Sequence, residues 1–148
     1  MSTVDMTARR RRPVLRVLPN LLLAPYALSV FLITLLPASQ AGRVTGIVDL
    51  LARWIDARVP YVESYALLEF LANVALFVPL GVLLRWGWPR MPWWITALIG
   101  LAMTLTIESV QTLLPSRFPT ISDVIANTAG TALGALFVAT LSVMFRRR

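Results

Sequence analysis

The chain has 148 residues, of which 57% are hydrophobic and 14% charged, and its formal net charge is +7. Soluble domains carry about 25% charged residues, so this composition excludes an ordinary soluble domain and indicates a membrane protein. The absence of cysteine and histidine excludes disulfides, thiolate and imidazole catalysis, and the usual zinc, haem and iron–sulfur ligands.

Four apolar segments approach or exceed the length of about 20 residues that a membrane-spanning helix needs. They lie at about 17–36, 65–84, 93–114 and 121–145. Pro25 and Pro79 fall inside the first two, where neighbouring helices are expected to satisfy the carbonyls that a kink frees. Residues 1–16 and 146–148 are basic tails. We therefore predict an all-α protein with one transmembrane domain over residues 17–145.

Arginine counts in the flanking segments orient the spans. All fourteen basic residues are arginines, and ten of them lie in the two tails and in the connection between the second and third spans. The positive-inside rule therefore predicts that both termini are cytoplasmic. Since no basic patch is interleaved with aromatic residues, we expect no nucleic-acid partner. Four tryptophans form an interfacial belt at the cytoplasmic ends of the second and third spans: Trp86, Trp88, Trp93 and Trp94.

The first span and the loop after it each allow two interpretations. The span resembles a signal peptide with a cleavage site at residues 39–41, but its apolar core exceeds the roughly 7–15 residues of such peptides. In the loop, about residues 37–64, apolar side chains recur at helical spacing and Asp49 and Arg53 lie on the opposite face. We expect an amphipathic helix in this external loop, either on the outer leaflet or as a soluble cap on the bundle.

Charged and amide side chains of the last three spans gather at one predicted depth, in the outer half of the membrane. The candidate binding residues are Glu69, Asn73, Glu108, Gln111, Arg117, Asp123 and Asn127. A bare carboxylate near the bilayer centre costs about 2.5–3.5 kcal/mol, so these side chains are expected to face one another. We predict a polar pocket open to the outer surface or the outer leaflet, with no metal and no cofactor required.

Small residues continue the polar stripes along the third and fourth spans. Gly100 and Thr104 precede Glu108, while Gly130 and Gly134 form a GxxxG pattern that favours close helix packing. Residues 69–75 (EFLANVA) and 123–129 (DVIANTA) also share a pattern of acid-x-x-Ala-Asn-x-Ala, and a Leu-Gly pair follows each. A parallel internal repeat and chance similarity between apolar helices are the two explanations.

Three stretches in this order resemble the VanZ-like family of small membrane proteins. They are NVALFVPLG at 73–81, IESVQ at 107–111, and R-x5-D-x3-N-x2-G from Arg117 to Gly130. The resemblance covers about residues 65–137 and marks Asn73, Pro79, Gly81, Glu108, Gln111, Arg117, Asp123, Asn127 and Gly130. Members often carry an acidic residue three positions after the Arg, where this chain has Thr120. If that acid takes part in binding or catalysis, this chain lacks the activity.

The resemblance implies a multi-pass protein of the bacterial plasma membrane and cell envelope, associated with antibiotic resistance, specifically to the glycopeptide teicoplanin. The expected partner is a membrane lipid, a lipid-linked cell-wall precursor or a lipoglycopeptide, whose head group the polar pocket would bind. Arg117 would then contact a phosphate or carboxylate.

Three other interpretations stay open. In an enzyme, Glu108 and Asp123 would act as an acid/base pair on a lipid-linked substrate. In a purely structural reading, the polar side chains join helices, as do the packing residues Pro79, Gly81, Gly130 and Gly134. A transport pathway is disfavoured because the polar groups stop in the outer half. A homo-oligomer is compatible with each interpretation.

Overall fold

The computed structural model describes residues 5–35, 61–115 and 119–146. They form α1 (Asp5–Leu35), α4 (Tyr61–Gly87), α5 (Trp93–Gln111) and α6 (Ile121–Arg146), and these described ranges contain no strand. Each helix includes a segment long and apolar enough to cross a membrane: Val17–Leu35, Ala66–Gly87, Trp93–Gln111 and Ile121–Phe145. The all-α fold with four spans is confirmed, and the span boundaries differ from the predicted ones by at most three residues.

Two predictions fall wholly or mainly on other parts of the chain. The cleavage site at residues 39–41 lies outside the described residues, as does the predicted amphipathic helix up to residue 60. The last residues of that predicted loop, 61–64, belong to α4. At the other end of the first span, α1 begins at Asp5, so much of the predicted tail continues the helix.

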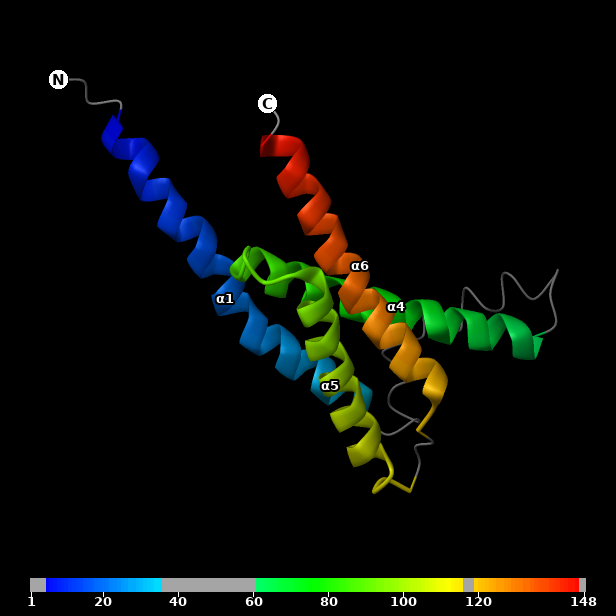
Figure 1. Ribbon diagram of the computed structural model, residues 1–148. Coiled ribbons are helices and arrows are strands. Elements are labelled where there is room, and N and C mark those ends of the chain that lie inside the picture. The colour runs from blue at the N-terminus through cyan, green and yellow to red at the C-terminus, as the bar shows by residue number, and fades with distance from the viewer. Residues whose placement is uncertain (1–4, 36–60, 116–118, 147–148) are drawn as a thin grey trace.

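The start of α1 and the end of α6 lie at one end of the molecule, and the end of α5 and the start of α6 lie at the opposite end (Figure 1). That both termini are cytoplasmic stays a prediction. Helix α4 crosses the others steeply, and its N-terminal part projects to the side of the bundle (Figure 1). In keeping with this, no side chain of residues 66–72 is buried, whereas buried residues recur from Phe77 onward.

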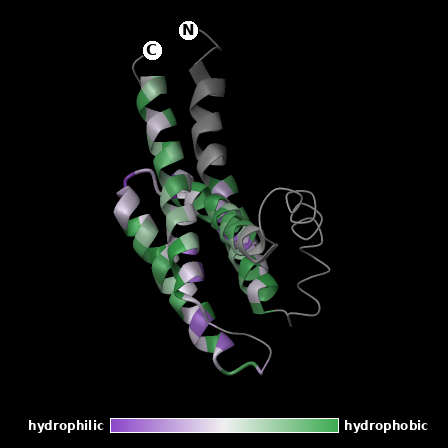
Figure 2. Ribbon diagram, turned by 90° about the vertical axis from the view of Figure 1, so that its right-hand side faces the viewer, coloured by the Kyte–Doolittle hydropathy of each residue, from purple (hydrophilic) through white to green (hydrophobic). Residues whose placement is uncertain are grey.

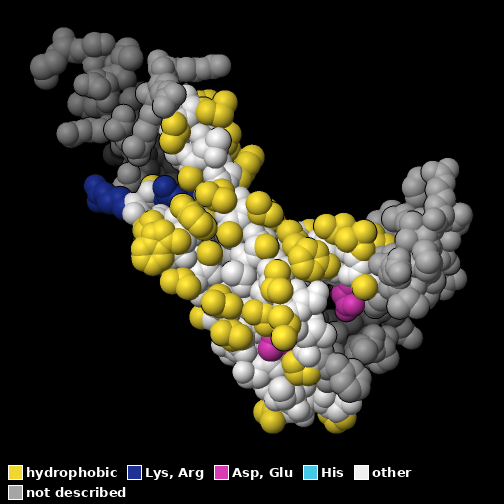
Figure 3. All heavy atoms as spheres, turned by 45° about the vertical axis from the view of Figure 1, so that its right-hand side comes forward, with side chains coloured by type: hydrophobic (Ala, Val, Ile, Leu, Met, Phe, Trp, Pro, Cys, Tyr) yellow, Lys and Arg dark blue, Asp and Glu magenta, His cyan; other side chains and the backbone are white. Residues whose placement is uncertain are grey.

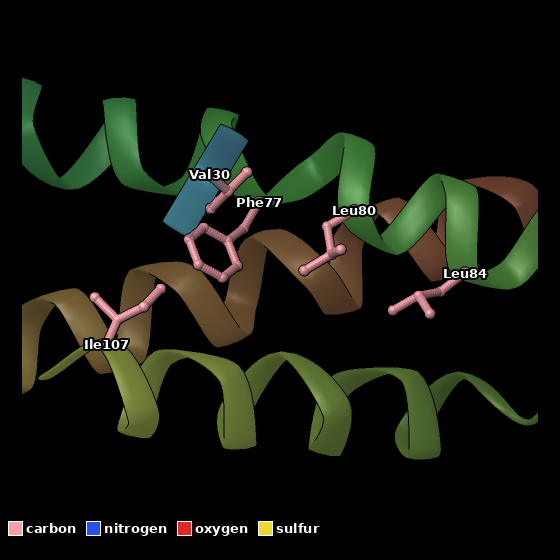
Figure 4. Close-up of a cluster of buried hydrophobic side chains, with 5 residues drawn as sticks. All are labelled: Val30, Phe77, Leu80, Leu84 and Ile107. Carbon is pink, nitrogen blue, oxygen red and sulfur yellow. The ribbon is translucent and has the colours of Figure 1, made fainter. Parts of the chain in front are cut away.

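A small hydrophobic core lies where α4 crosses α1, α5 and α6. Phe77, Leu80 and Leu84 are spaced three and four residues apart and therefore share one face of α4. They point toward the ribbons of α5 and α6 (Figure 4). Val30 from α1 and Ile107 from α5 complete the buried cluster.

Most of the large hydrophobic side chains lie on the outside instead. Exposed Leu, Ile, Val, Phe and Trp residues occur on all four described helices, and hydrophobic side chains cover much of the face in Figure 3. Figure 2 shows the hydrophobic colour along the helices and the hydrophilic colour gathering toward helix ends, including the lower end of α5 and α6. Such a surface is suited to contact with lipid, where apolar side chains need no burial within the protein.

Helices α4 and α6 approach so closely that glycine is required at their crossing. A Cβ atom on Gly81 would overlap the backbone carbonyl of Thr131, and one on Gly134 would overlap the carbonyl of Val78. Gly130 packs in the same way against the carbonyl of Val74. Because lipid supplies little hydrophobic driving force between helices, close backbone packing of this kind is a main source of their association.

Helix α4 continues as one α-helix through Pro79. Proline lacks a backbone N–H and weakens the hydrogen bonding of the preceding turn. The hydroxyl of Tyr26 on α1 donates to the carbonyl of Leu76 in that turn at 2.7 Å. Pro79 leaves the carbonyl of Ala75 without its usual helical donor, and Tyr26 binds the next carbonyl along, so this bond ties α1 to α4 beside the proline.

Candidate functional site

Glu108 lies on α5, near the end of the molecule opposite the termini. Its side chain is 7% exposed, and its Oε2 accepts a hydrogen bond from the backbone N–H of Thr120 at 3.0 Å. Thr120 directly precedes α6, and the first N–H groups of a helix have no partner inside the helix. Glu108 therefore connects the end of α5 to the start of α6. Within the described part of the chain, its carboxylate makes no ion pair.

Asp123 and Asn73 extend this connection to α4. The side-chain amide of Asn73 donates to Oδ1 of Asp123 at 2.7 Å. The backbone N–H of Asp123 donates to the hydroxyl oxygen of Thr120 at 3.1 Å, as expected when threonine caps a helix N-terminus. A continuous set of hydrogen bonds therefore links Glu108, Thr120, Asp123 and Asn73, and so joins α5, α6 and α4.

Asn127 lies one turn deeper on α6 and is 2% exposed. Its Nδ2 donates to the hydroxyl oxygen of Thr104 on α5 at 2.9 Å. Its Oδ1 is buried and has no hydrogen-bond partner among the described residues. A buried polar atom without a partner costs about 1–3 kcal/mol. This oxygen is therefore the clearest unmet hydrogen-bonding demand of the cluster.

Gln111 is directed toward a different helix. It is 6% exposed, and its Nε2 donates to the backbone carbonyl of Thr34 at 2.8 Å. Helix α1 ends at Leu35, and the last carbonyls of a helix have no partner within it. Gln111 thus caps the end of α1 and ties that helix to α5.

The other predicted residues have different placements. Glu69 is exposed on α4, one turn before Asn73, and Arg117 lies outside the described residues. The residues predicted to be structural lie along the contact of α4 and α6 or in the adjoining turns of α4: Pro79, Gly81, Gly130 and Gly134. The structure therefore brings Asn73, Glu108 and Asp123 together and sets Asn127 one turn below them. We call Asn73, Glu108, Thr120, Asp123 and Asn127 the polar cluster.

Thr120 and Thr104 bind side chains of the candidate site, yet neither is among the predicted site residues. The signal for Thr120 is the sequence T-x-x-D directly before an apolar run, which resembles a capping box. In a usual capping box, an acidic side chain three residues into the helix accepts the backbone N–H of the capping residue. Here Glu108 of α5 accepts the backbone N–H of Thr120 instead, so two helices share the capping pattern. No local pattern identifies Thr104 as the partner of Asn127, since that contact crosses between helices.

The chemistry of the cluster is that of oxygen acceptors and amide donors. No group of three or more His, Cys, Asp or Glu side chains that would hold a metal ion occurs among the described residues. The acidic side chains visible in Figure 3 lie away from the arginine side chains that the same view shows in blue. Two carboxylates with neighbouring amides suit recognition of a polar head group through hydrogen bonds and charge.

Comparison with known proteins adds one finding. A family model described as VanZ/LLP1 matches residues 23–142, a range that includes every candidate residue named above. No curated protein matches the chain, and no solved structure does.

Proposed function

The chain belongs to the VanZ/LLP1 family, as its resemblance to the VanZ-like proteins predicts, and we propose that it binds the head group of an amphiphile. Binding would take place in the outer half of the bacterial plasma membrane. The amphiphile is a membrane lipid, a lipid-linked cell-wall precursor or a lipoglycopeptide. By engaging it, the protein would reduce the susceptibility of the cell to glycopeptides such as teicoplanin.

The observation that supports this proposal is the polar cluster itself. Asn73, Glu108 and Asp123 come from three different helices and are connected by hydrogen bonds through Thr120. They lie at the end of the bundle away from the two termini, which the arginine distribution assigns to the outer side. Polar side chains inside membrane spans are costly and are usually functional.

The location of the cluster suits an amphiphile better than a soluble ligand. The helices around it expose large apolar side chains, such as Leu71 on α4 and Ile125 on α6. An acyl chain can lie against such a surface while its head group contacts the polar side chains. Teicoplanin carries a lipid tail and cell-wall precursors are lipid-linked, so both have the required amphiphilic form. Arg117, in the segment before α6, is the candidate for an anionic group of the ligand.

Hydrogen bonds within the protein favour a structural role for part of the candidate set. Gln111 caps α1 and Glu108 caps α6, and each bond joins two helices without any ligand. The alternative function is therefore that of polar contacts that only fix helix packing. The two functions differ in what they require of Glu108: packing needs an acceptor oxygen, whereas binding of a charged head group needs the carboxylate.

The test is antibiotic tolerance in a susceptible host that expresses the wild type, Glu108→Gln or Arg90→Gln. Glutamine keeps an acceptor for the N–H of Thr120, and Arg90 is an exposed residue near the opposite end. We expect wild type and Arg90→Gln to raise tolerance to teicoplanin more than to vancomycin, and Glu108→Gln to lose the effect at equal membrane abundance. Full tolerance with Glu108→Gln would favour the packing role. Equal tolerance in wild type and empty vector would remove the resistance function.

A further inference from the structure

We propose that the N-terminal part of α1, residues 9–16, binds anionic phospholipids of the membrane leaflet at its end of the molecule. We call these residues the basic segment, because five of the eight are arginines. The start of α1 lies at the end away from the polar cluster (Figure 1). The inference therefore goes beyond the proposed function and does not depend on it.

The charge of the chain is divided unevenly between the two sides that the order of the spans predicts. The side of the termini holds ten arginines and one carboxylate side chain, that of Asp5, which gives a formal charge of +9. Toward the other side lie four arginines and six carboxylates, which give a formal charge of −2. Anionic lipids give a membrane surface a negative potential that attracts basic segments next to a membrane span. The basic segment, with half of the ten arginines, has the charge that such a surface requires.

The basic segment is helical and continues directly into the first membrane span. Helix α1 begins at Asp5, and its membrane-spanning part begins at Val17. At about 1.5 Å per residue, Arg12 lies at most about 6 Å and Arg9 at most about 10.5 Å beyond Arg16. The head-group region of one leaflet is about 5–7 Å thick, and the Debye length at physiological salt is about 8 Å. Arg16 and Arg12 therefore fall within the head-group region, and Arg9 lies within one Debye length of it.

A contact between α1 and α4 fixes the position of the basic segment on the bundle. A Cβ atom on Gly87 would overlap the side-chain oxygen of Asn20, so Asn20 lies against the end of α4. Helical spacing places three arginines of the basic segment on the face of α1 that carries Asn20: Arg9, Arg12 and Arg16. This arginine face thus continues outward from the face that contacts α4.

The end of α4 also marks the level of the membrane interface. The four tryptophans of the predicted interfacial belt are all exposed, and two of them directly flank Gly87. Tryptophan is enriched at the level of the lipid head groups. Since Asn20 lies at this level and Arg16 is one turn further out, the arginine face lies at the level of the lipid phosphates. The planar guanidinium of arginine is well suited to bind phosphate.

Quenching of tryptophan fluorescence by brominated phospholipids measures the lipid preference of this surface. Four of the five tryptophans belong to the interfacial belt, so quenching reports mainly on lipids at that level. The purified protein is reconstituted into phosphatidylcholine vesicles that contain brominated phosphatidylglycerol or brominated phosphatidylcholine at the same mole fraction. Each measurement is made at low and at high salt.

Two matched variants each replace three arginines with glutamine. In the test variant they come from the arginine face: Arg9, Arg12 and Arg16. In the control variant they come from the connection between the first two spans: Arg43, Arg53 and Arg58. A third variant replaces the three arginines of the test variant with lysine, which keeps the positive charge.

We expect brominated phosphatidylglycerol to quench the wild type more strongly than brominated phosphatidylcholine does. Salt at about 1 M should remove most of the difference, because the Debye length then falls to about 3 Å. One arginine near an anionic surface is worth about fivefold in a binding constant. The preference for phosphatidylglycerol should therefore fall by at least about fivefold in the glutamine test variant. The control variant and the lysine variant should keep the preference of the wild type.

Three results would overturn the inference. The first is equal quenching of the wild type by the two lipids, and the second is a preference for phosphatidylglycerol that persists at high salt. The third is an equal loss of preference in the test and control variants, which would show that total charge and not the basic segment selects the lipid. If the glutamine test variant is not produced, the salt series and the comparison of the control and lysine variants with the wild type still decide.

Discussion

Thr120 uses both its backbone and its side chain at the start of α6. Its N–H donates to Glu108, and its hydroxyl oxygen accepts from the N–H of Asp123. Aspartate is at least as good as threonine at a helix N-cap. Related proteins often carry an acidic residue at this position. Thr120 therefore preserves the cap of α6 while removing a charge. On this view the missing acid is compensated structurally.

Replacement of Thr120 tests that assignment. Thr120→Ala removes the acceptor for the N–H of Asp123 and should lower the free energy of unfolding by about 1 kcal/mol, whereas Thr120→Ser should change it by only a few tenths. Thermal unfolding of the purified variants in one detergent measures the difference. Equal loss in Ala and Ser variants would show that the hydroxyl does not cap α6.

The site residues illustrate what a single sequence can predict at this scale. Hydropathy and helix direction are sufficient to place Glu108, Asp123 and Asn73 at one depth, because depth depends only on position along a span. They are insufficient to predict partners. Gln111 lies three residues after Glu108 yet binds the end of α1, because that choice depends on how the helices are rotated and crossed.

Among the helices, α4 and α6 form the most extensive contact, and their crossing is reciprocal. Gly81 packs against Thr131 and Ala135, and Gly134 packs against Val78 and Val82. Each residue of one set lies 53 positions from its counterpart in the other. The pattern shared by residues 69–75 and 123–129 has an offset of 54, one residue more, so the symmetric crossing does not follow the register of that sequence pattern. The hydrogen bonds break the symmetry, because Asn73 binds Asp123 whereas Asn127 binds Thr104.

A side chain at this crossing should separate the two helices. Gly134→Ile would place its Cβ on the backbone carbonyl of Val78, which belongs to a helix and has little freedom to move. We expect a loss of about 3 kcal/mol, the upper end of the usual cost of overpacking. The matched control is Thr140→Ile, at an exposed position of the same helix. Thermal unfolding in detergent compares the two, and similar midpoints would argue against a tight crossing.

Hydropathy predicted the number and length of the membrane-spanning helices well, because an apolar segment of the right length can form few structures in lipid other than a helix. The fourth span matched its predicted bounds, and the third ended three residues early, at Gln111. Residues 112–114 form a turn that is followed by Pro115, and a residue that precedes proline disfavours the α-helical conformation. Hydropathy does not register that local effect. The steep crossing of α4 was likewise not predicted, because it depends on which small residues meet.

At the scale of the whole molecule, the chain separates its polar groups by end. Arg85 and the connection between α4 and α5 lie toward the end of the termini, where the guanidinium donates to the carbonyls of Trp88 and Pro89. The polar cluster lies toward the other end, with Glu108 near the end of α5 and Asp123 in the first turn of α6. This separation follows from alternating helix direction and was therefore predictable. Ligand binding by the cluster was not predictable, because helix packing and ligand binding use the same residue types.

Equilibrium binding of a labelled amphiphile to the purified protein tests head-group recognition most directly. The ligands are a lipid-linked cell-wall precursor and a lipoglycopeptide, and the variants are Glu108→Gln, Arg117→Ala and the control Arg90→Gln. A lost charge-assisted hydrogen bond is worth about 1.5–3 kcal/mol, which corresponds to roughly tenfold to a hundredfold in Kd. We therefore expect saturable binding to the wild type and to Arg90→Gln, and binding at least about tenfold weaker to Glu108→Gln and Arg117→Ala. Identical binding in all four proteins, or none in the wild type, would contradict a head-group site at the polar cluster.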